Sequence, residues 1–333
     1  MPQTLILTRS DVLGLLADAT GEVESAVQRA HRDLALGRAV LPAPPAMALP
    51  GSDGTFLAMA SASAPAGLAA VKLLADLPGN RERGLPVQRS SVLVTSTETG
   101  APEALLDGGA LTRVRTAAAT AVATRALARA DARTLGLIGT GPLAHAHAHA
   151  LLPARAYERI VLWGRTPSRS QELATTLTSE LGLEAKVLDS PRAVTEAADV
   201  LCTLTPSREP LVRGAWFLDG QHINAVGAPP RPDHREIDTA GVVRSRIVVD
   251  AFDTARAKSG EVLIPLAEGA LGEDDFRCEL GQVLAGLAPG RTSDAEITLF
   301  DSVGVGLQDL ATARLLIDLA RERDVGTLID LGA

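Results

Sequence analysis

The sequence predicts an α/β fold built from a parallel-sheet domain and a second, α+β domain. Two observations lead to this prediction. From residue 134 to residue 250, short apolar runs alternate with helical stretches, which is typical of a parallel sheet covered by helices on both faces. Before residue 100, short β-type runs are separated by Gly and Pro clusters, as in an antiparallel sheet.

The α+β part is predicted to begin with helices. Leu5–Ala35 has a helical period, with one helix opening at Asp11 and a second, amphipathic helix over Glu22–Leu36. The Pro-rich run Leu41–Pro45 breaks any helix and holds the chain extended. Three β-type runs and an Ala-rich helix follow, at Thr55–Met59, Ala69–Ala75, Ser91–Thr95 and Arg115–Ala130.

The parallel-sheet part contains short apolar strands separated by helical stretches. The predicted strands are Leu135–Ile138, Arg159–Trp163, Asp199–Leu204, Gln221–Val226 and Ile247–Asp250. One more amphipathic helix, Gly306–Asp324, lies beyond them and is able to pack back on the first domain. We therefore assign residues 131–304 to the parallel-sheet domain, and residues 1–130 together with 305–333 to the α+β domain.

A glycine motif follows the first strand of the parallel sheet. It reads G-x-G-x-x-A over Gly139–Ala144, and a helix continues from it. Gly139 makes the tight turn, Gly141 lets a pyrophosphate approach the backbone, and Ala144 allows close helix packing. The helix N-terminus then faces the phosphates with free N–H groups. Because the βαβ unit closes at Trp163, the motif predicts a Rossmann dinucleotide-binding domain rather than a glycine-rich turn of another α/β fold.

The end of the second strand indicates which dinucleotide is preferred. An NAD site needs an acidic residue there to hold the ribose hydroxyls, and this chain has Gly164 in its place. Arg165, Thr166, Ser168 and Arg169 follow and are suited to hold a 2′-phosphate. We therefore expect NADPH to be favoured, with NADH possible; the alternative is that both arginines are solvated surface residues.

Composition excludes several other classes of protein. The net charge of -8 and the aromatic share of 2% argue against nucleic-acid binding. No apolar run is long enough to span a bilayer, and Met1–Ser10 lacks the pattern of a signal peptide. Cys202 and Cys278 are expected to be reduced thiols of a cytoplasmic protein, and no metal site is expected from them.

Several segments together resemble the ornithine cyclodeaminase/μ-crystallin family, and they occur in order along nearly the whole chain. They are Ala70–Leu73 with Pro78–Asn80, Ala104–Gly108, Leu111-Thr112 with Arg115–Ala118, Gly139–Ala144, Ile223–Gly227, Pro232–Glu236, Ile297–Gly304 and Leu307–Leu310.

The resemblance implies a substrate-binding and dimerisation domain at the N-terminus, a homodimer, and an active site between domains. It also implies that Lys72 and Arg115 contact the carboxylate region of a small imino or amino acid, and that Thr116 reaches the cofactor. A fixed guanidinium suits such a substrate because it binds a carboxylate bidentately. The full set of expected cofactor-binding residues is Thr116, Gly139, Thr140, Gly141, Pro142, Leu143, Ala144, Gly164, Arg165, Thr166, Arg169, Thr203, Thr205, Val226, Gly227, Ser302 and Gly304.

Lys72 is the strongest catalytic candidate on physical grounds. It is a cation in the apolar strand Leu68–Leu74, where an unpaired ammonium is costly. Asp76, the nearest carboxylate in sequence, is expected to lie past the end of this strand and out of reach. The expected partner of Lys72 is therefore a substrate carboxylate or imine.

Three departures from the family pattern bear on the reaction. Cyclodeaminases of the family carry an arginine in the Pro-rich segment, where this chain has Pro44-Pro45-Ala46. They carry a glutamate shortly before the position of Met59, where this chain has Leu57-Ala58. They also carry an aspartate after the Asn-Ala-Val-Gly run, where this chain has Ala228-Pro229-Pro230. Together these absences argue against cyclisation of ornithine with loss of ammonia.

Other polar groups are weaker candidates. His145 and His149 share a helix face at the i, i+4 spacing that can bind metal, but no acidic third ligand is evident, so surface or packing histidines, His147 included, are favoured. Asp233, Arg235 and Glu236 are either catalytic or part of a solvated loop, and Asp309 is expected to be a helix N-terminal charge rather than a base.

Three functions remain open. The first is an NADPH-preferring reductase of carboxylate-bearing imines, or the reverse amino-acid dehydrogenase, with Lys72 or a water supplying the proton. The second is a cyclodeaminase that reduces and re-oxidises its cofactor in each turnover. The third is a non-catalytic NADPH-dependent binding protein. Retention of both Lys72 and Arg115 favours the first.

Overall fold

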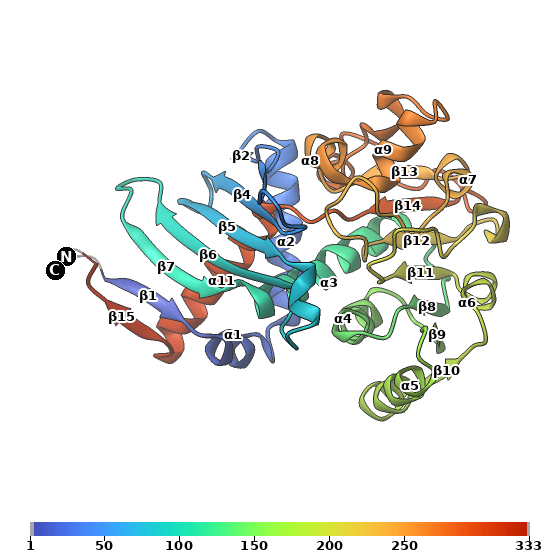
Figure 1. Ribbon diagram of the computed structural model, residues 1–333, viewed down its shortest axis with the longest axis horizontal. Coiled ribbons are helices and arrows are strands. Elements are labelled where there is room, and N and C mark those ends of the chain that lie inside the picture. Colours follow the sequence, from blue (N-terminus) through green and yellow to red (C-terminus); the bar gives the residue numbers. More distant parts are fainter. Residues whose placement is uncertain (1–2, 332–333) are drawn as a thin grey trace. The chain divides into compact units, whose positions relative to one another are not determined.

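The computed structural model describes residues 3–331, and the chain divides into two compact units (Figure 1). One unit is Met1–Thr116 with Gly304–Ala333, and the other is Ala117–Val303. The boundary falls inside helix α3 (Gly108–Leu127). We call them the first unit and the Rossmann unit. The roles that the sequence assigns to residues 1–130 with 305–333 and to residues 131–304 stay predictions.

The first unit contains an eight-stranded sheet with the order β15-β1-β7-β6-β5-β4-β2, and β3 also pairs with β4. The pairs β4–β5 and β5–β6 are antiparallel, as the sequence predicts for the runs before residue 100; β6–β7 is antiparallel too, but β7 is missing from the prediction. The strands are β1 (Thr4–Leu7), β2 (Ala39–Val40), β3 (Ala46–Ala48), β4 (Thr55–Ser63), β5 (Leu68–Asp76), β6 (Gln88–Ser96), β7 (Pro102–Asp107) and β15 (Thr327–Ile329).

The helical prediction for Leu5–Ala35 is wrong at its start. Thr4–Leu7 is a strand, β1, which pairs in parallel with β7 and antiparallel with β15. A strand of four residues is too short to show a period, and its partners lie about a hundred and three hundred residues further along the chain. The two predicted helices follow as α1 (Arg9–Leu16) and α2 (Thr20–Ala35), and Thr8 caps α1 in a capping box with Asp11.

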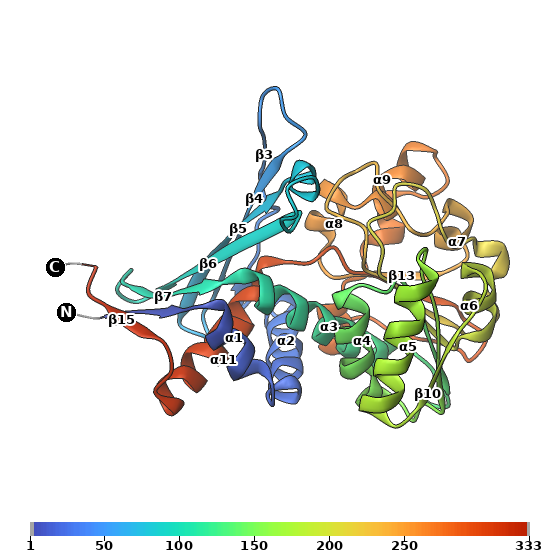
Figure 2. The same ribbon diagram turned by 60° about the horizontal axis from the view of Figure 1, so that its bottom comes forward.

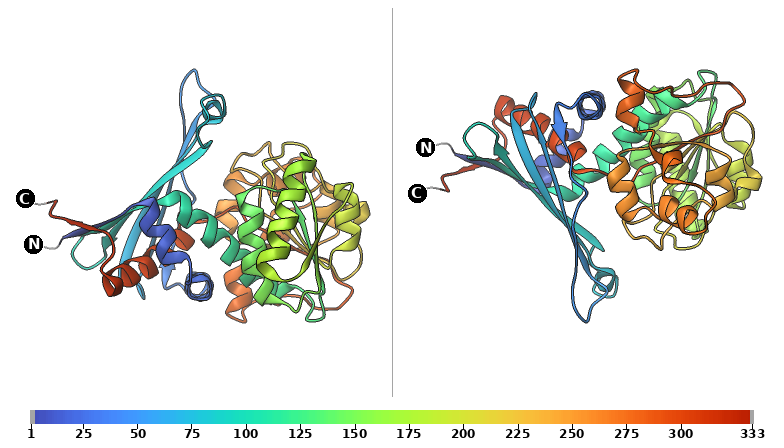
Figure 3. Two further views of the ribbon diagram at one scale, coloured as in Figure 1. Left: turned by 90° about the horizontal axis from the view of Figure 1, so that it is seen from below. Right: turned by 90° about the horizontal axis from the view of Figure 1, so that it is seen from above.

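Three helices gather on one face of this sheet (Figure 2). They are α1, α2 and α11 (Gly306–Arg323), and α11 contacts α2, β4 and β5. Both views of Figure 3 show the dark blue and red helices on the same side of the strands. The terminal helix predicted over Gly306–Asp324 is thus confirmed, and its packing back on the first unit is confirmed as well.

Helix α3 begins earlier than the predicted Arg115–Ala130. It spans Gly108–Leu127, because Asp107 acts as its cap: Asp107 Oδ1 accepts hydrogen bonds from the backbone N–H groups of Gly109 (3.1 Å) and Ala110 (3.3 Å). Helix propensity does not predict this start, because the helix begins with two consecutive glycines. Asp107, a residue type that is favoured as a helix cap, could have predicted it.

The Rossmann unit contains a seven-stranded sheet in which every pair is parallel, with the order β10-β9-β8-β11-β12-β14-β13. Its strands are β8 (Thr134–Ile138), β9 (Arg159–Trp163), β10 (Glu184–Val187), β11 (Val200–Thr203), β12 (His222–Ala225), β13 (Arg246–Val249) and β14 (Thr298–Asp301). Its helices after α3 are α4 (Pro142–Leu151), α5 (Pro167–Leu181), α6 (Pro191–Ala197), α7 (Thr239–Val243), α8 (Phe252–Lys258), α9 (Gly260–Ala267) and α10 (Leu280–Leu284).

Side chains of these strands alternate between two hydrophobic cores. Leu162 and Cys202 belong to one core, whereas their neighbours Val161 and Leu201 belong to another. This is the burial on both faces that the predicted parallel sheet requires. The five predicted strands are confirmed, but β10 and β14 are missing from the prediction. β10 is a partly polar edge strand, so its pattern is weak.

None of the helices within residues 3–331 combines the length and apolar composition that crossing a bilayer demands.

Candidate functional site

The glycine motif has the local geometry that the sequence predicts. Gly139 has a φ of 120°, and a Cβ there would lie 2.7 Å from the carbonyl oxygen of Leu204, so only glycine fits. A Cβ at Gly141 would meet no described atom within 4 Å, which leaves its backbone open to a ligand. Gly141 caps α4 in an extended conformation, with Pro142 at the first position and Ala144 fully buried. The motif therefore fits a bound pyrophosphate.

Gly164 lies against the same motif. A Cβ on Gly164 would approach the Thr140 side chain to 2.6 Å and Ser170 Oγ to 2.9 Å. A side chain at position 164 is thus excluded by packing as well as absent from the sequence. The carboxylate that would hold the ribose hydroxyls has no room here unless Thr140 moves.

The residues after Gly164 are accessible. Arg165, Thr166 and Arg169 are all exposed, and Thr166 is the N-cap residue of α5. Within the described part of the chain, neither Arg165 nor Arg169 makes a side-chain hydrogen bond or ion pair. Both guanidinium groups can therefore bind an anionic ligand.

Glu236 supports two of the loops assigned to the cofactor. Its side chain is fully buried, and its carboxylate accepts hydrogen bonds from Thr205 N (2.6 Å), Thr205 Oγ1 (2.6 Å) and Gly227 N (2.7 Å). Thr203, in β11, is also fully buried. Burial raises the pKa of Glu236, and the bonds from Thr205 oppose this. The solvated-loop interpretation is wrong for Glu236, which is a positioning residue for Thr205 and Gly227.

The two neighbours of Glu236 in that candidate group behave differently. Asp233 forms exposed contacts with Arg208 and His234. Arg235 donates to Thr239 Oγ1 at 2.8 Å. The solvated-loop interpretation holds for Asp233.

A small cavity of the Rossmann unit is lined by further expected cofactor residues. Val226 and Ser302 line it together with Glu261 and Asp301. Burial raises the pKa of both carboxyls, and the charge of Asp301 raises the pKa of Glu261 further. Asp301 Oδ2 and Ser302 Oγ are buried without a hydrogen-bond partner among residues 3–331. A polar ligand in this cavity would satisfy them.

The catalytic candidates of the first unit form a buried charge cluster. Lys72 Nζ lies 2.9 Å from Oδ1 and 2.8 Å from Oδ2 of Asp309, and 3.3 Å from Thr112 Oγ1. Arg115 Nε donates to Asp309 Oδ1 at 3.1 Å. The side chains of Lys72 and Asp309 are 1% exposed and that of Arg115 is 5% exposed. The carboxylate of Asp309 thus contacts both cations.

A hydrogen-bond chain orients the arginine. Arg115 Nη1 donates to Gln308 Oε1 at 2.7 Å, and Gln308 Nε2 donates to His31 Nε2 at 3.0 Å. Burial and the charge of Arg115 lower the pKa of His31 to about 4, so this ring is neutral and able to accept at neutral pH. Gly304 adjoins the same guanidinium, since a Cβ there would lie 2.8 Å from Arg115 Nη1.

Packing of α11 on the sheet brings Asp309 to Lys72. A Cβ on Gly306 would lie 2.8 Å from the Met59 carbonyl oxygen, so glycine lets the first turn of α11 approach β4 closely. Met59 is the cross-strand partner of Lys72 in the β4–β5 register. Asp309 follows three residues after Gly306, on the same turn, and therefore meets the lysine.

The expectation that Lys72 lacks a partner in the protein is therefore wrong. The expectation that Asp76 lies past the end of the strand is wrong as well, because Asp76 is the last residue of β5; Lys72 contacts Asp309, 237 residues away in the sequence. Asp309 does lie in the first turn of a helix, as expected, but that position does not describe its role. Thr116, an expected cofactor residue, donates its hydroxyl to the Thr112 carbonyl at 2.7 Å.

The three histidines of α4 separate into two kinds. His147 is fully buried and contacts Thr120 Oγ1 (3.0 Å) and the Leu143 carbonyl (2.8 Å). His145 and His149 lie on the surface, and both contact Glu180 of α5. The statement that no acidic group accompanies them is wrong, because the carboxylate comes from another helix.

Comparison with known proteins adds a family and several relatives. A family model described as the ornithine cyclodeaminase/mu-crystallin family matches residues 3–324. The alanine dehydrogenase of Archaeoglobus fulgidus is 35% identical, and the match covers 98% of this chain and 98% of that protein.

Two solved structures are similar over nearly their whole length. Thermococcus litoralis Δ1-pyrroline-2-carboxylate reductase, in complex with NADH and L-proline, has a TM-score of 0.93 and 37% identity, and covers 97% of this chain and 99% of that chain. An archaeal alanine dehydrogenase dimer with bound NAD has a TM-score of 0.93 and 33% identity, and covers 99% of both chains. These structures have the α/β fold of this chain, with its Rossmann-like unit.

Proposed function

Because the chain belongs to the ornithine cyclodeaminase/mu-crystallin family, we propose that it is a nicotinamide-dependent oxidoreductase of small carboxylate-bearing imines or amino acids. In one direction the reaction reduces a C=N bond to a CH–NH bond, and in the other it oxidises the CH–NH bond to C=N. The relatives named above act on substrates of this class, one cyclic and one linear. The observation that carries the proposal is the buried cluster of Lys72, Arg115 and Asp309, in which two cationic side chains of the kind that bind a carboxylate lie on one aspartate.

Arg115 is the proposed carboxylate anchor. Gln308 and Asp309 already hold its Nη1 and Nε, so its plane is set before a ligand arrives. A guanidinium that is held in this way loses little entropy on binding and fixes the substrate by two parallel hydrogen bonds. The orientation of the reacting carbon follows from that anchor.

Lys72 is the proposed proton source at the imine nitrogen, directly or through a water. Its ammonium group is buried and contacts both carboxylate oxygens of Asp309. A nicotinamide dinucleotide held at the glycine motif Gly139–Ala144 would supply the hydride. The chain's own part is to bind the carboxylate, orient the C=N bond and deliver the proton.

Nicotinamide absorbance with a substrate panel tests the proposal. The panel contains pyrroline-2-carboxylate, piperideine-2-carboxylate and pyruvate with ammonia, each with NADPH and with NADH. We expect oxidation of the reduced cofactor by at least one of them. Ornithine is the comparison, because the three missing cyclodeaminase residues predict no release of ammonia and proline from it.

The other two functions give different results in the same assay. Ammonia released from ornithine in step with proline would establish a cyclodeaminase. Tight binding of cofactor and imine without turnover would establish a binding protein. Either result would overturn the proposed reductase.

We further propose that NADPH is preferred over NADH, although the solved relatives hold NADH or NAD. Arg165 and Arg169 are exposed, and Gly164 leaves no carboxylate to repel a 2′-phosphate. Arg165→Asp should reverse the ranking, with a loss of about 1–3 kcal/mol in NADPH binding. Titration calorimetry with both cofactors measures this.

The control for that variant is Arg192→Asp, an exposed arginine that pairs with Glu196 on α6. It should leave both affinities unchanged. Equal affinity of the wild type for the two cofactors, or tighter NADH, would refute the preference.

We propose that the chain is a homodimer and that the sheet face opposite the helices forms the interface. Leu73, Leu93 and Leu105 expose 47%, 38% and 41% of their surface there, and Leu93 is paired with Leu105 across β6 and β7. Sedimentation should give twice the mass of the chain. The double variant Leu93→Arg, Leu105→Arg should give a monomer, whereas Leu218→Arg, at an exposed site of the Rossmann unit, should not. A monomeric wild type would refute the proposal.

A further inference from the structure

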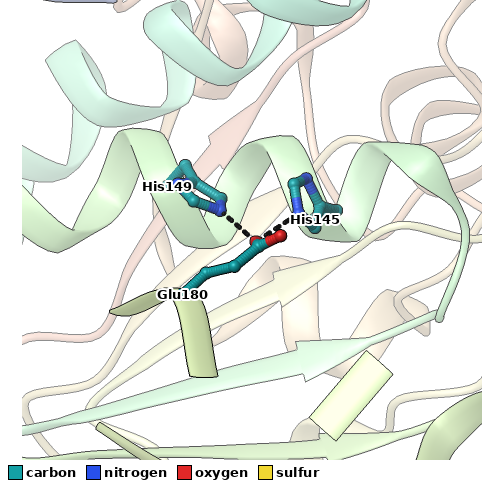
Figure 4. A group of neighbouring side chains, drawn as sticks. All are labelled: His145, His149 and Glu180. Carbon is teal, nitrogen blue, oxygen red and sulfur yellow. Dashed lines mark hydrogen bonds and ion pairs between the residues drawn. The ribbon is translucent and has the colours of Figure 1, made fainter. Parts of the chain in front are cut away.

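Two histidines and a glutamate meet on the surface of the Rossmann unit; none of the three is assigned to cofactor or substrate, although His145 directly follows Ala144 of the glycine motif. His145 and His149 lie one turn apart on α4, and Glu180 lies in the last turn of α5. Figure 4 shows both rings facing the same carboxylate. His145 Nε2 is 2.7 Å, and His149 Nε2 2.8 Å, from the same oxygen, Glu180 Oε2.

The donor atoms are those that borderline metal ions select. Two imidazole nitrogens and one carboxylate oxygen form the ligand set of many three-residue zinc sites, in which a fourth position stays open. The side chains of His145, His149 and Glu180 are 42%, 39% and 43% exposed, so water can occupy such a fourth position. The three ligand atoms lie within 4.8 Å of one another.

Holding an ion requires adjustment of all three ligand distances: the ring nitrogens of His145 and His149, which lie within 4.8 Å of each other, have to reach tetrahedral spacing, and both nitrogen–oxygen distances have to lengthen. Metal–ligand bonds of about 2.0–2.1 Å in a tetrahedron place ligand atoms about 3.3 Å apart. The two nitrogen–oxygen distances, 2.7 Å and 2.8 Å, therefore have to lengthen by about half an ångström. Glu180 is exposed and near the end of its helix, so its side chain can retreat that far. The helical i, i+4 spacing already aligns the rings, whose centroids are 4.6 Å apart.

We propose that His145, His149 and Glu180 form a site for a divalent cation of the zinc class, with Co²⁺ and Ni²⁺ as substitutes. The ion links α4 to α5, the helices that follow the first two strands of the Rossmann βαβ unit. The site is independent of the proposed reductase activity. Its ligands are three side chains of one unit, and none of them is assigned to the cofactor or the substrate.

Co²⁺ and Zn²⁺ titrations of the full chain test the site. We expect one Co²⁺ per chain, with a visible d–d absorption and no thiolate charge-transfer band, since neither Cys202 nor Cys278 takes part. Competition with a chromogenic chelator measures the Zn²⁺ affinity. His149→Ala and Glu180→Gln should each weaken it by more than about 100-fold, beyond the 10–100-fold loss typical of an outer-shell partner.

The matched control is Glu172→Gln, an exposed glutamate two turns earlier on α5. It should bind Zn²⁺ like the wild type. Saturating Zn²⁺ should also raise the melting temperature of the wild type and of Glu172→Gln, but not that of His149→Ala, because binding to the folded state alone stabilises it. If His149→Ala and the wild type bind Zn²⁺ equally, the three side chains form a hydrogen-bonded cluster only and the proposal is overturned.

Discussion

Replacing Asp309 with alanine should destabilise the first unit by about 3–5 kcal/mol, the loss typical of breaking a buried ion pair. Among residues 3–331, Asp309 contacts both Lys72 and Arg115, and the side chains of all three are at most 5% exposed. Without it, two cations remain side by side in a poorly solvated place. The cost comes from their desolvation and repulsion rather than from the lost contact alone.

Hydrogen exchange in β5 and α11 is the suitable measurement, because both tryptophans of the chain, Trp163 and Trp216, lie in the Rossmann unit. Asp318→Ala is the matched control: Asp318 is on the same helix and pairs with Arg314, but both side chains are nearly half exposed. That variant should cost at most about 1 kcal/mol. Similar losses for the two aspartates would show that the buried cluster does not stabilise the unit.

Lys72→Ala should lower kcat/KM about 30- to 1000-fold, which corresponds to a loss of about 2–4 kcal/mol in transition-state stabilisation. The variant loses both a charged contact to the substrate and the proposed proton source. Asp309 keeps Arg115 as a partner, so the loss of stability should be smaller than in Asp309→Ala. Steady-state rates and cofactor affinity, measured on the same preparations, separate these effects.

Two further variants make the assignment of Lys72 specific. Lys186→Ala removes an exposed lysine of β10 and should leave turnover unchanged. Lys72→Arg should not restore activity fully, because a guanidinium is larger and does not release its proton at working pH. Full activity in Lys72→Ala, or a loss of cofactor binding that matches the loss of turnover, would remove Lys72 from the reaction.

Features that depend on one short stretch of chain could be predicted from the sequence. The turn at Gly139 needs a φ that glycine adopts freely, and the surrounding motif is typical of dinucleotide-binding sites. Strands such as β8 and β9 can be predicted from their continuous apolar runs, because both faces of the sheet are buried. The amphipathic period of α11 likewise predicted the terminal helix. In each case the signal and the structure lie in the same few residues.

Pairings between distant stretches were decided only by the tertiary structure. Lys72 and Asp309 are 237 residues apart, and their contact exists because Gly306 lets α11 approach β4. Glu180 meets His149 because α4 and α5 pack against each other. Glu236 is buried rather than solvated because its carboxylate accepts hydrogen bonds from Thr205, which lies 31 residues earlier in the sequence. A local sequence pattern indicates whether a residue is buried. The partner of a buried charge depends on which helices and strands pack together, and this packing is determined by the free energy of the whole unit.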